Sequence, residues 1–285
     1  MANIRLIRRR VRGVQSTSKI TRAMEMIATS KMRRTQERGL AGRPYSEKIH
    51  QVIADLAALP VEGRVLHPLL QRRPVAKIAI VHITPDRGLC GGLNTSLNRR
   101  AANFILGQSV PVTLITVGRK GRDFMRRYGR EIRAEFTGLG DRPSLLDTLP
   151  ISRIIIDDYT SRIVDMVYLV YAQFISTMAQ RPVAQQILPV EPAAIPTAQN
   201  VDYIYEPGPG VVLGGLLPRF VEMQVYHAIL EAIASEQSAR MVAMRNATDN
   251  ANELIEELTL MYNKARQESI TKELLDITGG TAALT

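Results

Sequence analysis

Apolar residues at the start of the chain recur at the spacing of one helix face. Four aliphatic residues follow one another three or four positions apart: Ile4, Ile7, Val11 and Val14. The stripe then resumes out of phase, at Ile20, Met24 and Ile27. The pattern predicts a long helix over residues 1–59, bent or briefly interrupted near Gly42.

The end of the chain shows a more regular pattern. Its apolar and small residues occupy successive seam positions of a coiled coil: Met244, Ala247, Ala251, Leu254, Leu258, Met261 and Ala265. Helical periodicity runs from about Arg219, just after Pro218, to Asp276, and Gly279 and Gly280 are expected to end it. The prediction is a second long helix over residues 219–277. At 1.5 Å per residue, each terminal helix would extend on the order of 80 Å.

The middle of the chain, residues 74–207, alternates short β-rich runs with helical pieces. Strands are expected at 75–83, 110–117, 131–137, 166–175 and 183–190. Helices are expected at 94–106, 119–128 and 151–162. This alternation favours a mostly parallel sheet covered by helices, a Rossmann-like α/β domain. The Pro- and Gly-rich stretch 189–218 links back to the last helix and has a candidate short strand at 203–205.

Chain order fixes how the two helices run. The chain leaves the first helix into the middle domain and returns from it into the last helix, so the helices are expected to pair antiparallel. The predicted fold class is mixed α+β: a long antiparallel two-helix coiled coil with a Rossmann-like domain inserted between its two helices.

The charge distribution supports pairing. The chain of 285 residues has a net charge of +10, which alone suggests a nucleic-acid or membrane partner. However, residues 1–38 hold eleven Lys or Arg against two Asp or Glu, whereas residues 221–285 hold five against ten. Segments of opposite charge are placed to attract each other or two different partners.

Several kinds of site lack support in the sequence. Residues 86–94 (DRGLCGGLN) follow the first strand, where phosphate loops occur, but their spacing fits neither glycine-rich template, and a tight turn with Asn94 as helix cap explains them. Cys90 has no local histidine partner, the four histidines show no zinc spacing, and Asp157 and Asp158 point in different directions. We expect no catalytic residue, cofactor or metal, and a solvated Asp157–Asp158 pair.

Two further features bear on location and partners. A single cysteine allows no internal disulfide, and no stretch is long and apolar enough for a signal peptide or a membrane span. The basic runs 8–10 and 31–34 resemble the DNA-contacting part of a basic zipper, but solvated helix faces explain them equally well. A soluble protein without direct membrane insertion is expected.

Three separated motifs carry a resemblance to a known family. They are residues 17–28 and 30–34 (TSKITRAMEMIA and SKMRR), residues 86–94, and residues 235–251 with 263–274 (SEQSARMVAMRNATDNA and NKARQESITKEL). Together they resemble the γ subunit of rotary F-type ATP synthases of the bacterial type, over the whole chain.

The resemblance implies a central rotor shaft without catalytic residues of its own. It implies that the shaft turns with a proton-driven membrane c-ring and switches the catalytic sites of α and β subunits during ATP synthesis or hydrolysis. The implied partners are the α and β subunits, the ε subunit and the c-ring, with no nucleic acid. The implied location is the cytoplasmic face of the cell membrane, as a peripheral protein.

The resemblance also assigns roles to individual positions. Met24 is expected to face the acidic lever of a β subunit, with basic residues as charge complements: Lys19, Arg22, Lys31, Arg33 and Arg34. Four polar residues correspond to contacts with β catch loops: Arg240, Gln267, Thr271 and Glu273. Three residues correspond to an apolar tip held in a hydrophobic bearing: Leu274, Leu275 and Ile277.

Overall fold

A computed structural model describes residues 4–58, 67–191, 206 and 208–282. The chain divides into two compact units. The first joins residues 1–28 with 240–285, and the second comprises residues 29–239. We call them the coil unit and the α/β unit. The unit boundaries lie inside both terminal helices, so a large part of each helix belongs to the α/β unit rather than to a separate coiled-coil domain.

Helix α1 spans Ile4–Ala58 without a break, although it includes Gly39, Gly42 and Pro44. The interruption expected there does not occur. Tertiary packing explains part of this, since a β-carbon at residue 42 would lie 2.8 Å from Cε1 of His227 on α5. The glycine therefore permits a close approach of two helices, and that contact offsets its poor helix propensity.

Helix α5 spans Pro209–Ala282 and starts ten residues before the predicted position. It includes Pro218, which the sequence analysis used as the helix boundary, and it continues through Gly279 and Gly280. Leu213 and Leu217 are buried in the core of the α/β unit. Burial of these side chains favours helix before the proline and outweighs its local cost. The candidate strand at 203–205 lies outside the described residues.

The α/β unit is built on a five-stranded sheet of order β3-β2-β1-β4-β5. The strands are β1 Ile78–Ile83, β2 Val112–Val117, β3 Ile132–Phe136, β4 Met166–Phe174 and β5 Gln180–Leu188. Neighbouring strands pair in parallel, except β5, which runs antiparallel to β4. All five strands overlap their predicted positions, with ends displaced by at most three residues.

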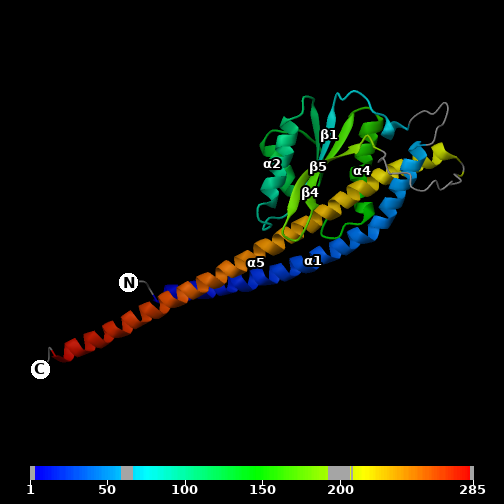
Figure 1. Cartoon of the computed structure of the whole chain (residues 1–285). Coiled ribbons are helices and arrows are strands. Elements are labelled where there is room, and N and C mark those ends of the chain that lie inside the picture. The colour runs from blue at the N-terminus through cyan, green and yellow to red at the C-terminus, as the bar shows by residue number, and fades with distance from the viewer. Residues whose placement is uncertain (1–3, 59–66, 192–205, 207, 283–285) are drawn as a thin grey trace. The chain divides into compact units, whose positions relative to one another are not determined.

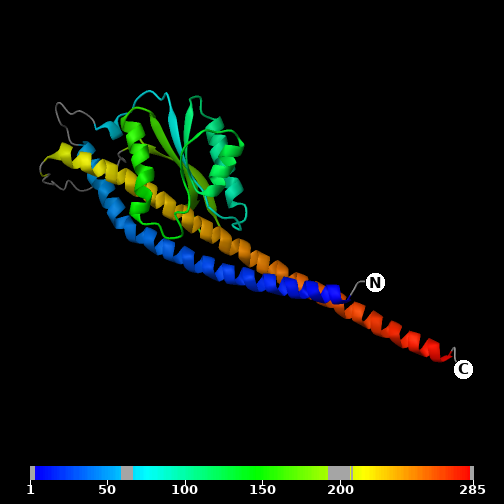
Figure 2. The same ribbon diagram turned by 180° about the vertical axis from the view of Figure 1, so that it is seen from behind.

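Helices cover both faces of this sheet (Figures 1 and 2). On one face, α2 (Leu93–Leu106) and α3 (Arg119–Arg127) pack over β1 and β2. On the other face lie α4 (Leu145–Thr160), the start of α5, and the short 3₁₀ helix η1 (Pro68–Leu70). Helix α4 begins six residues early because Ser144 and Asp147 form a capping box ahead of Pro150.

The main core lies on the α4 and α5 face. It joins side chains from both ends of the chain and from the sheet: Ile49, Ile53, Val81, Ile115, Ile155, Leu169, Leu217, Val221 and Ile229 are among its members. This core therefore holds the inner parts of α1 and α5 against the sheet.

The coil unit pairs α1 and α5 antiparallel, as predicted. Ser18 donates a hydrogen bond to Asn252 (2.9 Å), the Thr21 and Thr248 hydroxyls lie 2.7 Å apart, and Arg245 donates to Glu25 (2.8 Å). Residue numbers rise on one helix as they fall on the other, which establishes the antiparallel direction.

The seam of this coil differs from the predicted one at several positions and agrees with it on α5 at four: Met244, Ala251, Leu258 and Ala265. On α1, buried or half-buried positions continue in phase through Ser18, Thr21 and Ala28, whereas Ile20 and Ile27 are 60% and 54% exposed. The out-of-phase stripe is thus an outer face.

On α5, the inner positions include Thr248, Ile255 and Tyr262, one residue beyond the predicted ones, and Leu254 and Met261 are 42% and 55% exposed. Both registers have 3-4 spacing, so apolarity alone selects the wrong one. The hydrogen bonds of Thr21 and Thr248 favour the observed register.

Candidate partner-binding surfaces

The crevice where Rossmann-like folds bind nucleotides is filled by the protein itself. In this sheet order the crossovers diverge between β1 and β4, which is the usual ligand position at the carboxyl ends of the strands. Cys90 and Leu93 pack there against Ala172 of β4 and Ala239 of α5. Ser235 of α5 also donates a hydrogen bond to the Ala172 carbonyl (2.9 Å). Helix α5 therefore occupies the space that a nucleotide would need.

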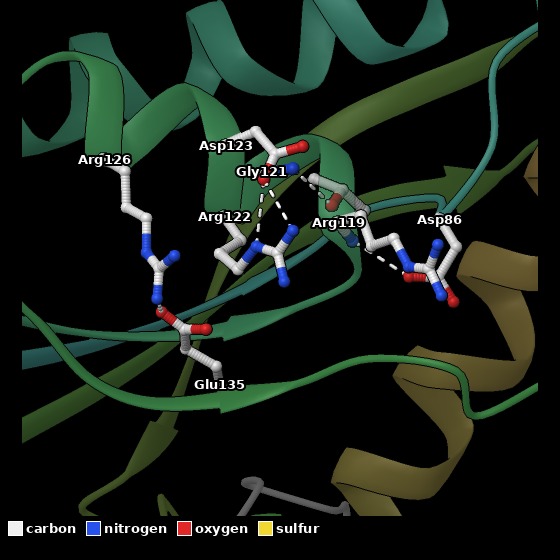
Figure 3. A network of polar contacts seen from close by, with 8 residues as sticks. Asp86, Arg119, Gly121, Arg122, Asp123, Arg126 and Glu135 are labelled. Atoms are coloured by element: carbon white, nitrogen blue, oxygen red, sulfur yellow. Dashed lines mark hydrogen bonds and ion pairs between the residues drawn. The ribbon is translucent and has the colours of Figure 1, made fainter.

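The loop 86–94 joins neighbouring segments through hydrogen bonds to Asp86. Figure 3 shows the Asp86 carboxylate beside the start of α3, where one oxygen accepts the Arg119 backbone N–H (2.9 Å). The other oxygen accepts the Gly138 N–H beyond β3 (2.9 Å). One carboxylate thus joins three segments at the same edge of the sheet. The remaining charged groups in Figure 3 pair locally, Arg122 with Asp123 and Arg126 with Glu135.

Next to this loop, the backbone at Gly118 closely approaches the backbone at Thr84. Gly118 has φ +96°, and a β-carbon there would overlap the Thr84 carbonyl oxygen. The Thr84 hydroxyl accepts the Gly121 N–H (2.8 Å). These contacts fix the turn from β2 into α3 and give its two glycines a structural role.

Asn94 does not cap α2 as expected. The helix begins at Leu93, and the Asn94 amide instead donates to the Arg87 carbonyl (3.5 Å) and to the Cys90 sulfur (3.3 Å). Cys90 is 1% exposed. A thiol so enclosed is placed for packing rather than for nucleophilic attack.

Two buried ionisable side chains of the α/β unit have polar partners within the protein. His82 lies on β1 with Nε2 2.9 Å from the Asn98 oxygen, and burial lowers its pKa. Asp158, expected to be solvated, is 3% exposed and accepts two hydrogen bonds from Arg133 (2.7 Å each), which raise the pKa of Arg133. Among the described side chains, no three His, Cys, Asp or Glu residues gather as a metal site requires.

The basic residues of the first helix form an exposed surface. Of the eleven Lys and Arg in residues 1–38, ten are exposed. Lys31 is the half-buried one, and its ammonium lies 2.6 Å from Asp141 of the α/β unit. Arg33 pairs with Glu37 one turn further along α1. The ion pair across the coil, Glu25 with Arg245, has signs opposite to the net charges of the two segments.

The positions assigned by the resemblance differ in how exposed they are. Met24 is half-buried and lies beside the contacts between α1 and α5, and Arg240 is half-buried at the start of the α5 part of the coil unit. Gln267 and Thr271 are exposed and four residues apart, so they share one face of α5.

Glu273 accepts a hydrogen bond from Ser269 (3.3 Å). The apolar residues of the tip are all well exposed: Leu274, Leu275 and Ile277. Within the described residues, no helix is long and apolar enough to cross a bilayer.

Known proteins match the chain along its full length. A family model described as ATP synthase matches residues 3–284. The ATP synthase gamma chain of Dehalococcoides mccartyi strain CBDB1 is 68% identical over 284 residues, covering all of both chains. The chain belongs to the ATP synthase γ chains. That of Chloroflexus aurantiacus strain J-10-fl is 50% identical over 289 residues, again covering all of both chains.

Solved structures agree on the fold. A chain of the Euglena gracilis mitochondrial ATP synthase, in a structure of OSCP, F1 and the c-ring, superposes with a TM-score of 0.67 at 21% identity. The match covers 99% of this chain and 94% of that one. A rotor structure from the same organism gives a TM-score of 0.64 at 20% identity, covering 94% and 98%. The coil and the inserted α/β domain are therefore shared features.

Sequence reasoning missed the polar contacts between the two helices. Thr21 and Thr248 were passed over because seam positions were sought among apolar residues. The α1 positions alone had a signal in the sequence, since Ser18, Thr21, Glu25 and Ala28 continue the 3-4 spacing of Ile4 to Val14.

Proposed function

We propose that this chain is the central rotor shaft of an F-type ATP synthase, which couples proton-driven rotation of a c-ring to conformational change at the catalytic sites of α and β subunits. The observation that carries the proposal is the full-length match to γ chains together with the antiparallel pairing of two long terminal helices. A paired, hydrogen-bonded set of long helices suits the transmission of rotation. The filled crevice agrees with a subunit that leaves nucleotide chemistry to its partners.

The proposed partners are the α and β subunits around the coil, and the ε subunit and c-ring beside the α/β unit. The Euglena gracilis structures, described as a rotor and as OSCP, F1 and c-ring, support this assignment by fold. We place the chain at the cytoplasmic face of the cell membrane as a peripheral subunit held there by the c-ring.

On the coil, Met24 is proposed to face the acidic lever of a β subunit. The exposed side chains of Lys19, Arg22, Arg33 and Arg34 supply positive charge on the same helix. Lys31 has Asp141 as an internal partner, so its contribution to a β contact is the smallest of the set. Solvent-exposed cations also speed the encounter with an acidic partner.

Further along α5, Gln267, Thr271 and Glu273 are proposed to meet catch loops of β subunits, with Arg240 nearer the α/β unit. Leu274, Leu275 and Ile277 are proposed to lie in an apolar bearing. Their exposure supports this, because clustered exposed apolar side chains mark a protein interface.

The proposal is tested by assembly and by locking. Mixing the purified chain with α and β subunits should give a stable complex with sustained Mg-ATP hydrolysis. In a Cys90→Ala background, a Met24→Cys variant should form a disulfide with a cysteine placed in the acidic lever of β. Oxidation should stop hydrolysis, and reduction should restore it.

The matched control is Cys90→Ala without the Met24 substitution, which should keep its activity under oxidation. Failure of the chain to co-purify with α and β would overturn the rotor assignment. A complex that stays active when cross-linked would overturn the role of Met24.

A further inference from the structure

Three cross-helix polar contacts follow one another in the coil unit. They join Ser18 to Asn252, Thr21 to Thr248 and Glu25 to Arg245, at 2.9, 2.7 and 2.8 Å. We call these six residues the polar ladder. It covers the stretch of α1 that contains Met24.

The centre of the polar ladder is enclosed. Thr21 and Thr248 are 9% and 7% exposed. Each hydroxyl also lies within hydrogen-bond distance of a carbonyl of its own helix, that of Ser18 for Thr21 (3.0 Å) and that of Met244 for Thr248 (2.9 Å). One hydroxyl therefore donates to the other, while the second donates to its own backbone.

Helix α1 carries a competing face beside the ladder. Ile20, Met24 and Ile27 have seam spacing and are more apolar than the residues that the seam uses. Over residues 18–28, hydrophobicity alone would favour a local roll of α1 by one residue position that buries Ile20 and Ile27. In the structure both stay exposed, at 60% and 54%, while Ile7 nearer the N-terminus is buried in the observed orientation. Within residues 18–28, apolar burial alone therefore does not account for the observed orientation.

We propose that the polar ladder sets the rolling orientation of α1 on α5 and thereby holds the Ile20–Ile27 face outward, with Met24 at its edge, for the apolar surface of the surrounding subunits. Apolar contacts have no preferred direction, whereas hydrogen bonds do. A roll of α1 would separate all three pairs at once. Buried polar residues in coiled coils are known to specify one arrangement in this way, at a cost in stability.

The polar ladder residues are thus positioning residues for the proposed rotor function, on which this inference rests. A rolled α1 would present Ser18 and Thr21 outward and would bury the face that partners contact.

The orientation is tested in the isolated full-length chain by paired cysteines in a Cys90→Ala background. Ala28→Cys with Met241→Cys reports the observed orientation, since both residues face the seam. Ile27→Cys with Met241→Cys reports the rolled one. With the ladder intact, the 28–241 disulfide should dominate.

Replacing both threonines by alanine should raise the yield of the 27–241 disulfide relative to 28–241 by about twofold to tenfold over the serine variant, the equilibrium effect of one net hydrogen bond. The serine variant, Thr21→Ser with Thr248→Ser, keeps both hydroxyls, differs from the alanine variant only in them, and should keep the 28–241 disulfide dominant. Circular dichroism verifies that each variant remains helical. Equal ratios in the alanine and serine variants would overturn the inference.

The role in coupling is measured in the assembled complex without reporter cysteines. The alanine variant should pump about twofold to tenfold fewer protons per ATP hydrolysed than the serine variant, the same factor as for one net hydrogen bond, while hydrolysis itself continues. The serine variant should couple normally. A shifted disulfide ratio with normal coupling would overturn the positioning role, whereas loss of assembly in the wild-type chain would instead count against the rotor proposal.

Discussion

Helix α5 serves two different environments along its length. In the α/β unit, its first turns bury large side chains in a broad core, with Leu217, Val221 and Val225 fully enclosed. In the coil unit, the same helix presents a narrow seam to α1. It is built from Met244, Ala251 and the half-buried Ile255 and Tyr262, and it includes the polar Thr248. The first part is held mainly by the amount of apolar surface it buries. The second part is held by less surface but with directional contacts.

This difference teaches where each kind of substitution should act. Truncating a side chain should matter most where the core is broad, because cavity cost scales with lost packing. Backbone propensity and polar pairing should matter relatively more in the coil, where few large side chains are buried. The predictions below test this contrast.

The largest effect is expected from Leu217→Ala. This side chain is 0% exposed in the main core, so its truncation should lower the free energy of unfolding of the α/β unit by about 3 kcal/mol. Hydrogen exchange of the amides of β1 and β4 in the full-length chain measures it. The control is Leu274→Ala, 57% exposed, expected to change stability by less than about 0.5 kcal/mol. Equal losses of unfolding free energy in the two variants would contradict the expected difference between a core side chain and an exposed one.

A pH effect confined to one unit comes next. Burial lowers the pKa of His82, so the folded state stays neutral while the unfolded state takes up a proton below about pH 6.5. The α/β unit should therefore lose stability as pH falls below that value, by up to about 1.4 kcal/mol per pH unit.

The coil segments 1–28 and 240–285 contain no histidine and should show no such loss between pH 8 and 6. Hydrogen exchange at several pH values follows both units in one sample. His82→Gln should flatten the slope in the α/β unit. A slope that persists in that variant would show that another group titrates.

The smallest effects are expected from two glycine substitutions, one in each unit, which should change stability in opposite directions. Gly13 lies exposed in α1 with nothing within 4 Å of a β-carbon, so Gly13→Ala should stabilise the coil by about 0.5 to 1 kcal/mol. Gly42→Ala should destabilise, because its β-carbon would lie 2.8 Å from His227. Exchange protection of the flanking α1 amides distinguishes them. Destabilisation by Gly13→Ala would mean that this part of the coil needs a glycine.

The sequence predicted the sheet well because β-rich runs alternate with turns in residues 74–190. Each strand overlaps its prediction, and the antiparallel pairing of the two terminal helices followed from chain order. Helix starts were less predictable. Pro150 and Pro218 suggested boundaries, but a capping box at Ser144 and buried Leu213 begin α4 and α5 earlier.

The coil seam was partly misassigned because hydrophobicity ranks Ile20 above Thr21 and Ala247 above Thr248. The deciding contacts join residues more than 200 positions apart, so a pattern within one helix does not contain them. The assigned partner contacts, from Met24 to Ile277, come from the resemblance, and their exposure supports them without testing them.

The residues of the main core come from distant parts of the chain, so they are synthesised at different times. Ile49 and Ile53 emerge early from the ribosome, the sheet follows, and Leu217, Val221 and Ile229 come only after it. Until α5 arrives, one face of the sheet is covered only in part, by α4 and η1, the crevice beside Cys90 lacks the cover that α5 provides, and exposed apolar surface of this kind favours aggregation. The nascent chain therefore carries an unfinished domain through most of its translation, and the segment that completes the domain is the helix that then continues into the shaft.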